Sequence, residues 1–149
     1  MRSGTENVPG IVGFAKALEL AQKEKLQENK RLTSLRNHFI QTVLAKIPHT
    51  HLNNHLSQCL PGIINISFAG VEAEAVVRYL SQQKIYVSSG SACSSQKIES
   101  SHVLRALGLS EKAAMASVRF SLGRTTSKKD LDQVILILAE IIRSLRRVA

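Results

Sequence analysis

The residue of this sequence best placed to do chemistry is a cysteine inside a polar run. Cys93 stands within the stretch Ser88-Ser89-Gly90-Ser91-Ala92-Cys93-Ser94-Ser95. A structural cysteine usually lies among aliphatic residues, whereas a reactive cysteine needs solvent access and polar donors that stabilise its thiolate. Cys93 has the second kind of neighbourhood, which predicts a nucleophilic thiol on an exposed loop.

Two further side chains could bind an anionic group. Arg119 falls in a predicted strand in which Val118, Phe120 and Leu122 alternate with polar residues, so its side chain should project from the face opposite the core. A guanidinium can hold a carboxylate through two parallel hydrogen bonds, although an ordinary exposed arginine is the alternative. Thr5 could donate its hydroxyl to a phosphate, although a Gly-Thr pair is more often only a turn.

The period of the apolar positions predicts the elements around these residues. Alternation from Ile63 to Phe68 predicts a half-buried strand, and Val71 to Gln82 has the period of a helix with one apolar face. Ile85–Val87 is expected to be a short strand that leads into the cysteine loop. Two short helices are expected between Ser101 and Ala116, before the strand that carries Arg119.

Long helices are predicted near both ends of the chain. Apolar residues at helical spacing begin at Ile11, and we expect one helix, or two in line with a bend near Asn29, ending at Pro48. Ser127 and Asp130 have the spacing of a capping box. The apolar positions that follow recur every three or four residues and should cover the sheet: Leu131, Ile135, Leu138, Ile142 and Leu145.

A metal site is one interpretation of the stretch after the first helix. We expect a short strand at His49–Leu52 and a solvated loop at Asn53–Pro61. Here His51, His55 and Cys59 fall four residues apart, a spacing that would bring them together only on a helix. We therefore expect no metal. Two cysteines are not a disulfide framework, so we also expect free thiols, with nothing in the sequence near Cys59 to favour a thiolate.

The composition is that of an ordinary globular domain. The chain has 149 residues, of which 44% are hydrophobic, and its net charge is +9. The longest apolar run, Val134–Ala139, is far shorter than the roughly 20 residues of a membrane span, and no signal sequence follows Met1, so a cytoplasmic protein is expected. The basic residues lack aromatic neighbours that could stack on bases, which favours a solvated face or an acidic protein partner over nucleic acid.

Three motifs in order carry a family resemblance. SSGSAC at 88–93, VLRALG at 103–108 and VRFSLGR at 118–124 resemble the cysteine desulfurases of the NifS/IscS kind, in the class-V aminotransferase family. The resemblance extends upstream to LPGIINISF at 60–68 and to RSGT at 2–5. It implies an α/β fold, the small C-terminal domain of a fold-type I pyridoxal-phosphate enzyme, with a short mixed or antiparallel sheet packed by helices.

The resemblance also implies roles for the candidate residues. Cys93 would take sulfur from L-cysteine as a persulfide and leave L-alanine, and Arg119 would hold the substrate carboxylate. Thr5 would reach the pyridoxal phosphate of the partner subunit in a homodimer. The SSGSAC wording resembles the group that hands sulfur to an iron–sulfur scaffold or another acceptor protein, which implies a role in iron–sulfur cluster assembly.

One family feature is missing from this sequence. The lysine that carries the cofactor in the family lies in a Ser-x-His-Lys setting, and the nearest resemblance here, around Lys97, is in the wrong place. We therefore expect a C-terminal portion, with residues 1–48 as a linking helical segment and residues 49–149 as the small domain, whose cysteine loop is 88–100. Most of the cofactor site is expected to lie in an N-terminal cofactor-bearing portion or chain. The present chain alone is therefore not expected to bind the cofactor. A stand-alone sulfur-acceptor-binding adaptor and an inactive remnant are the alternatives.

Overall fold

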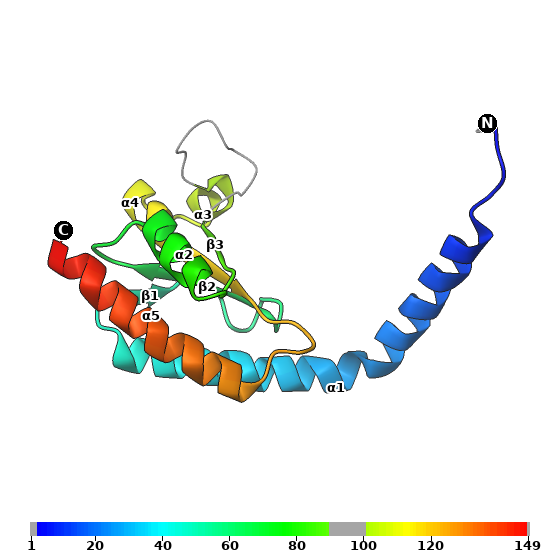
Figure 1. Ribbon diagram of the computed structural model, residues 1–149, viewed down its shortest axis with the longest axis horizontal. Coiled ribbons are helices and arrows are strands. Elements are labelled where there is room, and N and C mark those ends of the chain that lie inside the picture. The colour runs from blue at the N-terminus through cyan, green and yellow to red at the C-terminus, as the bar shows by residue number, and fades with distance from the viewer. Residues whose placement is uncertain (1–2, 90–100, 149) are drawn as a thin grey trace.

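The computed structural model describes residues 3–89 and 101–148 of the chain. Five helices and four strands follow one another within these residues (Figure 1). In chain order they are α1 (Val8–Lys46), β1 (Thr50–Leu52), β2 (Ile63–Phe68), α2 (Ala73–Gln82), β3 (Ser88–Ser89), α3 (His102–Ala106), α4 (Glu111–Met115), β4 (Ser117–Ser121) and α5 (Lys128–Val148).

The strands form one sheet in the order β1-β2-β4-β3, and each neighbouring pair is antiparallel. The α/β class and the short sheet expected from the sequence are confirmed, and the sheet is antiparallel rather than mixed. β2 and β4 occupy the centre of the sheet. Their apolar residues alternate with polar ones, so the apolar side chains are buried on a single face. The residues that point to the other face therefore come together as a polar surface.

The hydrophobic core lies between that apolar face and the helices α1, α2 and α5. Ile64, Ile66 and Phe68 of β2 are fully buried in it, together with Val118 and Phe120 of β4. The helices supply the other side of the core through one apolar stripe each: Phe39, Ile40 and Val43 from α1, Val76 and Leu80 from α2, and Leu131, Ile135, Leu138 and Ile142 from α5. Burial of these side chains is the main source of the domain's stability.

The second half of α1 belongs to this core. Phe39 packs in the core of this chain itself, on the face of α1 that turns toward the sheet. Phe39 is 0% exposed, and its ring centroid lies 5.0 Å from that of Phe120 with the planes tilted by 54°. Leu35 packs at the edge of the same cluster.

The first half of α1 carries the apolar residues that remain uncovered. α1 is one continuous helix, and Figure 1 shows it bending along its length and extending away from the sheet. Phe14 is exposed to 73%, and the other large apolar side chains of this stretch are exposed to between 42% and 77%: Val8, Ile11, Val12, Leu18, Leu20 and Leu26. In Figure 1 no other described element lies beside this half of the helix.

The strand expected at Ile85–Val87 is wrong in position, because pairing with β4 begins only at β3, Ser88–Ser89. The chain leaves α2 through Lys84, whose φ of 59° is in the left-handed region, and the Ile85 amide donates to the Leu80 carbonyl at 3.0 Å. Ile85 is therefore used to end the helix, and the chain reaches the edge of β4 three residues later.

α5 begins at the expected capping box. The backbone amide of Ser127 donates to Asp130 Oδ2 at 2.8 Å, and the Asp130 amide donates to Ser127 Oγ at 3.2 Å. The bonds that Asp130 accepts from the Ser127 hydroxyl and backbone amide hold the pKa of this carboxyl below its ordinary value. Among the described helices, none is long and apolar enough to cross a lipid bilayer.

Candidate functional site

Arg119 lies at the centre of the polar face of the sheet. Arg119 is in β4, where it lies opposite Asn65 of β2 on one side and opposite Ser88 of β3 on the other. Its side chain is exposed, as expected, and it makes only a long contact among the described residues, from Nη2 to Ser88 Oγ at 3.5 Å. Within residues 3–89 and 101–148, no carboxylate lies within 4.0 Å of this guanidinium. Among the described residues it therefore has no anionic partner, which agrees with a role in anion binding.

A connected hydrogen-bond network lies beside Arg119 on the same face. Asn53 Nδ2 lies 2.6 Å from Asn65 Oδ1, 2.8 Å from Ser67 Oγ and 3.1 Å from Ser117 Oγ. The two serine hydroxyls are 2.8 Å apart, and Ser117 donates to the Ala113 carbonyl of α4 at 2.7 Å. Ser117 is 0% exposed, so this network is buried at the α4 side and opens toward Arg119. Hydrogen bonds that link several side chains in this way restrict the motion of the residues that they connect.

The sequence did not single out these four network residues as part of a site. The signal was present, because Asn65 and Ser67 are the polar members of an alternating strand, as are Arg119 and Ser121 of its neighbour. Alternation shows which residues share a face of one strand, but it does not show which residue of the next strand lies opposite. The antiparallel register supplied that information.

Cys93 and Lys97 lie outside the described residues, so the predicted role of Cys93 stays a prediction. The structure describes the two points between which the cysteine loop must run. Ser89 pairs with Val118 at the edge of the sheet, and Ser101, which is buried, precedes α3. Ser88, which the sequence placed in the loop, is instead paired opposite Arg119. The loop therefore leaves the sheet directly beside the predicted carboxylate site.

Thr5 is exposed and lies before α1, next to Gly4 with its φ of 126°. Figure 1 shows this N-terminal segment at the far end of α1 from the sheet, so the structure does not bring Thr5 and Arg119 together in one chain. The residues described do not fit a complete pyridoxal-phosphate site. Thr5 makes no enclosed phosphate site there, and none of the described lysines has the sequence context expected of the cofactor lysine.

Cys59 has a neighbour that the sequence did not indicate. Arg36, which is 6% exposed, points its Nη1 atom at Cys59 Sγ over 3.1 Å, and its other nitrogens donate to Asn37 Oδ1. The contact joins the loop before β2, which carries Cys59, to α1, and the expectation about the Cys59 thiol stays a prediction. Among the described residues, no group of three or more His, Cys, Asp or Glu side chains is placed to hold a metal ion.

The loop after β4 is held by a separate set of charges. Arg31 of α1 donates to the Thr126 carbonyl at 2.7 Å and to the Gly123 carbonyl at 3.0 Å, while its Nε donates to Glu28 at 2.8 Å. The hydrogen bonds from Arg31 lower the pKa of the Glu28 carboxyl. This contact joins the end of β4 to α1 and thereby helps to fix the strand that carries Arg119.

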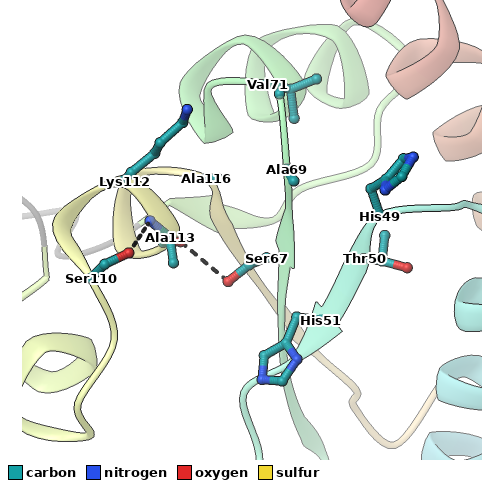
Figure 2. Close-up of a pocket in the computed structure, with 11 residues that line it drawn as sticks. His49, Thr50, His51, Ser67, Ala69, Val71, Ser110, Lys112, Ala113 and Ala116 are labelled. Carbon is teal, nitrogen blue, oxygen red and sulfur yellow. Dashed lines mark hydrogen bonds between the residues drawn. The ribbon is translucent and has the colours of Figure 1, made fainter.

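A cavity of about 460 Å³ opens beyond the other end of the network (Figure 2). Ser67 lines both the cavity and the network, and Figure 2 shows its hydroxyl bonded to the Ala113 carbonyl. The longer polar side chains at the cavity, His49, His51 and Lys112, point in different directions in Figure 2. These three side chains do not converge on one ligand position. Arg119 and the hydrogen-bond network beside it therefore remain the candidate site.

The comparisons with known proteins agree with this architecture. The family model of the class-V aminotransferases matches residues 1–134. A cysteine desulfurase, IscS, of Methanosarcina thermophila is 45% identical over 148 residues, which are 99% of this chain and 36% of that protein. A cysteine desulfurase of Nostoc sp. is 47% identical over 145 residues, which are 97% of this chain and 36% of that protein.

Solved structures show the same fold. A NifS-like protein superposes with a TM-score of 0.81 at 29% identity, over 96% of this chain and 36% of that one. A NifS-like protein from Rickettsia africae superposes with a TM-score of 0.77 at 30% identity, over 95% of this chain and 36% of that one. The chain thus spans little more than a third of the proteins that it matches. It belongs to the class-V aminotransferase family, and its relatives there are cysteine desulfurases.

Proposed function

We propose that the chain is the C-terminal portion of a pyridoxal-phosphate-dependent cysteine desulfurase, which takes sulfur from L-cysteine as a persulfide on Cys93 and releases L-alanine. The observation that carries the proposal is the position of Arg119. Its guanidinium is exposed, has no carboxylate partner among the described residues, and lies beside the strand from which the Cys93 loop departs. An amino-acid substrate needs such a cation to bind its carboxylate.

Arg119 would position the substrate. The planar guanidinium can donate two parallel hydrogen bonds to the two oxygens of a carboxylate, which fixes both the place and the orientation of the amino acid. Because β4 is a central strand of the sheet, the arginine backbone is held on both sides, by β2 and by β3. The substrate sulfur would then project from a defined point.

Cys93 would be the nucleophile that meets this sulfur. Cys93 follows Ser89 by four positions, so the extended chain limits the distance between their Cα atoms to about 14 Å. Since Ser89 pairs with Val118, next to Arg119, the thiol can reach a substrate held by the arginine. Covalent catalysis by a positioned thiol of this kind divides a difficult bond cleavage into easier steps.

The sulfur transfer balances without an outside oxidant. The Cys93 thiolate attacks the substrate sulfur, a sulfur–sulfur bond forms, and the bond between that sulfur and the substrate Cβ breaks. The electron pair of the broken bond stays on Cβ, which takes a proton and becomes the methyl group of alanine. When bound, pyridoxal phosphate supplies the electron sink that makes this cleavage possible.

The rest of the active site would come from other chains or segments. We propose that an N-terminal cofactor-bearing portion or partner chain holds the pyridoxal phosphate, and that Thr5 contacts the cofactor phosphate of the partner subunit in a homodimer. Separation of Thr5 from Arg119 along α1 supports two different sites for them. An iron–sulfur scaffold or another acceptor protein in the cytoplasm would receive the sulfur.

Two alternatives from other classes remain in competition. A stand-alone adaptor would bind the sulfur acceptor without catalysing turnover, and an inactive remnant would neither bind the acceptor nor catalyse turnover. The face around Arg119 favours the enzyme. In the described part of the chain this guanidinium has no carboxylate partner, and it lies beside a polar network where the cysteine loop leaves the sheet. An adaptor that only binds an acceptor protein does not need this arrangement.

The test is reconstitution with a cofactor-bearing N-terminal portion taken from the Methanosarcina thermophila relative. We expect the pair of chains to release alanine from L-cysteine and to carry one extra sulfur on Cys93, measured by mass spectrometry. Cys93→Ser should abolish both products because it removes the nucleophile. Cys59→Ser is the matched control and should keep turnover near that of the parent. Turnover lost in Cys59→Ser but kept in Cys93→Ser would overturn the proposal.

A further inference from the structure

We propose that Asn65, oriented by Asn53, is a second donor for the substrate carboxylate beside Arg119. The inference rests on the proposed function, which supplies the carboxylate. It assigns to the LPGIINISF segment a part in substrate positioning. Four observations carry it: the strand register, the direction of the Asn65 amide, the buried network that fixes Asn53, and the lack of acidic neighbours among the described residues.

The register places the two side chains next to each other. In the β2–β4 pair, the Leu122 amide donates to the Gly62 carbonyl at 2.8 Å, and the Phe68 amide beyond the ladder donates to the Ala116 carbonyl at 3.0 Å. Hydrogen-bonded and non-hydrogen-bonded pairs alternate along an antiparallel ladder, so Asn65 and Arg119 form a non-hydrogen-bonded pair. Their Cα atoms are then only about 4.5 Å apart, and their side chains leave the same face.

The Asn65 amide has one end occupied and one end unused. Its Oδ1 accepts a hydrogen bond from Asn53 Nδ2 at 2.6 Å, on the side away from Arg119. Within the described part of the chain, its Nδ2 donates no hydrogen bond, and the residue is only half-buried. A side-chain amide carries two donor hydrogens on that nitrogen. They are therefore available next to the guanidinium, where a carboxylate would lie.

Asn53 is itself held rigidly, so the direction of the Asn65 amide is imposed. The Asn53 backbone amide donates to the Asn65 carbonyl at 2.9 Å, which continues the β1–β2 ladder by one residue. Its side chain contacts the buried hydroxyls of Ser67 and Ser117. Rotating the Asn65 amide by half a turn would face its nitrogen toward the Asn53 nitrogen and lose this bond.

No acidic side chain of the described segments competes for these donors. Neither Arg119 nor Asn65 contacts an Asp or Glu among the residues that the structure describes. A carboxylate has two oxygens with about four acceptor positions, so it can accept the guanidinium and the amide together. A halide ion lacks the two separated acceptor atoms that would use both donors.

The experiment measures anion binding to the 149-residue chain directly. The chain is labelled with ¹⁵N and titrated with sodium acetate, while sodium chloride at the same ionic strength corrects for screening. We expect acetate to shift the Arg119 Nε–H and Asn65 Nδ2–H signals with one common dissociation constant. Asn65→Leu should weaken acetate binding, measured at Arg119, by roughly tenfold because one hydrogen bond to the charged carboxylate is lost.

Two further variants separate the donor from its support. Asn65→Asp keeps an oxygen for Asn53 Nδ2 but replaces the donor by a negative oxygen, so the acetate-induced shift at Arg119 should be lost. Asn53→Ala leaves Asn65 in place without its orienting bond, and acetate binding should weaken. Ser121→Ala, on the same face of β4, is the matched control and should bind like the parent. Parent-like methyl signals of Ile64 and Ile66, on the core face of β2, identify the folded variants.

The outcomes distinguish the inference from the function on which it rests. If folded Asn65→Leu and Asn65→Asp bound acetate like the parent while Arg119→Gln lost it, Asn65 would not be a donor and the carboxylate role of Arg119 would stand. If Arg119→Gln bound acetate like the parent, or if acetate moved neither signal, both the inference and the assigned role of Arg119 would be overturned.

Discussion

At the scale of single residues, the polar face of the sheet combines one cation with one hydrogen-bond network. Arg119 supplies the charge, and the neighbouring residues Asn53, Asn65, Ser67 and Ser117 form hydrogen bonds that reach the Ala113 carbonyl of α4. The charge alone would attract any anion, whereas the neighbouring amide has a defined direction. The carboxylate preference proposed for this face would therefore come from geometry rather than from charge.

Arg119→Lys tests the geometric role of the arginine. Lysine keeps the charge but cannot donate two parallel hydrogen bonds from one rigid plane. In the reconstituted desulfurase we expect KM for L-cysteine to rise by about tenfold, or ~1.5 kcal/mol, with a smaller change in kcat. Steady-state kinetics check this, and a KM equal to that of the parent would argue that the carboxylate lies elsewhere.

Arg146, near the C-terminal end of α5, forms hydrogen bonds to other parts of the chain in addition to any interaction with the helix end. The negative end of the helix is by itself a sufficient reason for a cation in the last turns of α5. In the structure its guanidinium donates to the carbonyls of Ala69 at 2.9 Å, Pro48 at 2.7 Å and His49 at 3.2 Å. Desolvation lowers the pKa of Arg146. The arginine thus joins α5 to the chain just before β1 and just after β2, which lie at the same end of this antiparallel pair.

At the scale of elements, the capping box of α5 makes the start of that helix sensitive to pH. Hydrogen bonds from Ser127 hold the pKa of Asp130 below its ordinary value of 3.8. A carboxyl whose pKa is lowered by folding contributes stability that is complete above the unfolded pKa. That contribution is lost as the pH falls through the folded pKa.

Asp130→Asn should therefore destabilise the chain at neutral pH, where the parent carries the ionised carboxylate. The difference in free energy of unfolding between variant and parent should shrink as the pH falls below about 4. Urea unfolding followed by circular dichroism at several pH values measures it. Glu140→Gln, on α5 but outside the capping box and without an ion pair among the described residues, is the control. A difference that persisted unchanged at acid pH would contradict the assignment.

The two halves of α1 should respond differently to the same substitution. Phe39 is fully buried against Phe120, and Phe14 is 73% exposed. Phe39→Ala should lower the free energy of unfolding by about 3–5 kcal/mol, because it removes buried apolar surface and leaves a cavity. Phe14→Ala should leave it within about 0.5 kcal/mol of the parent. Equal effects of the two changes in chemical denaturation would show that the division of α1 is wrong.

At the scale of the whole molecule, the described residues form one hydrophobic core, and the first half of α1 lies outside it. The exposed apolar residues of residues 8–26 lie along one stretch of helix that no described element covers in Figure 1. Soluble proteins rarely leave apolar patches of more than a few hundred Å² uncovered without a partner. This chain spans little more than a third of its relatives, and the remaining part of such a protein could cover the exposed stretch of α1.

We therefore expect the chain on its own to associate. Replacing Ile11, Phe14 and Leu18 together by glutamine should reduce the average mass seen by light scattering and the binding of an apolar dye. Leu136→Gln, a single exposed leucine on α5, is the control and should change neither. A parent chain that stays monomeric and binds no dye at high concentration would contradict this expectation.

The expected division at residue 48, between a linking helical segment and the small domain, stays a prediction.

The sequence by itself determined most elements of the fold, because hydrophobic period and capping residues act locally. It placed β2, α2 and β4 nearly at their observed bounds, and it identified the α5 capping box together with the outward direction of Arg119. The motifs around Cys93 and Arg119 are also sufficient to indicate the family, because they depend only on residue types and spacing.

Only the tertiary structure decided which side chains are neighbours across elements. The pairing of Asn65 with Arg119, the contact of Arg36 with Cys59 and the burial of Phe39 all join segments far apart in the sequence. The strand at β3 began later than its apolar pattern indicated, because Ile85 was used to end α2. Periodicity specifies the face of each element, whereas strand register and helix packing, which the period leaves open, specify what that face meets.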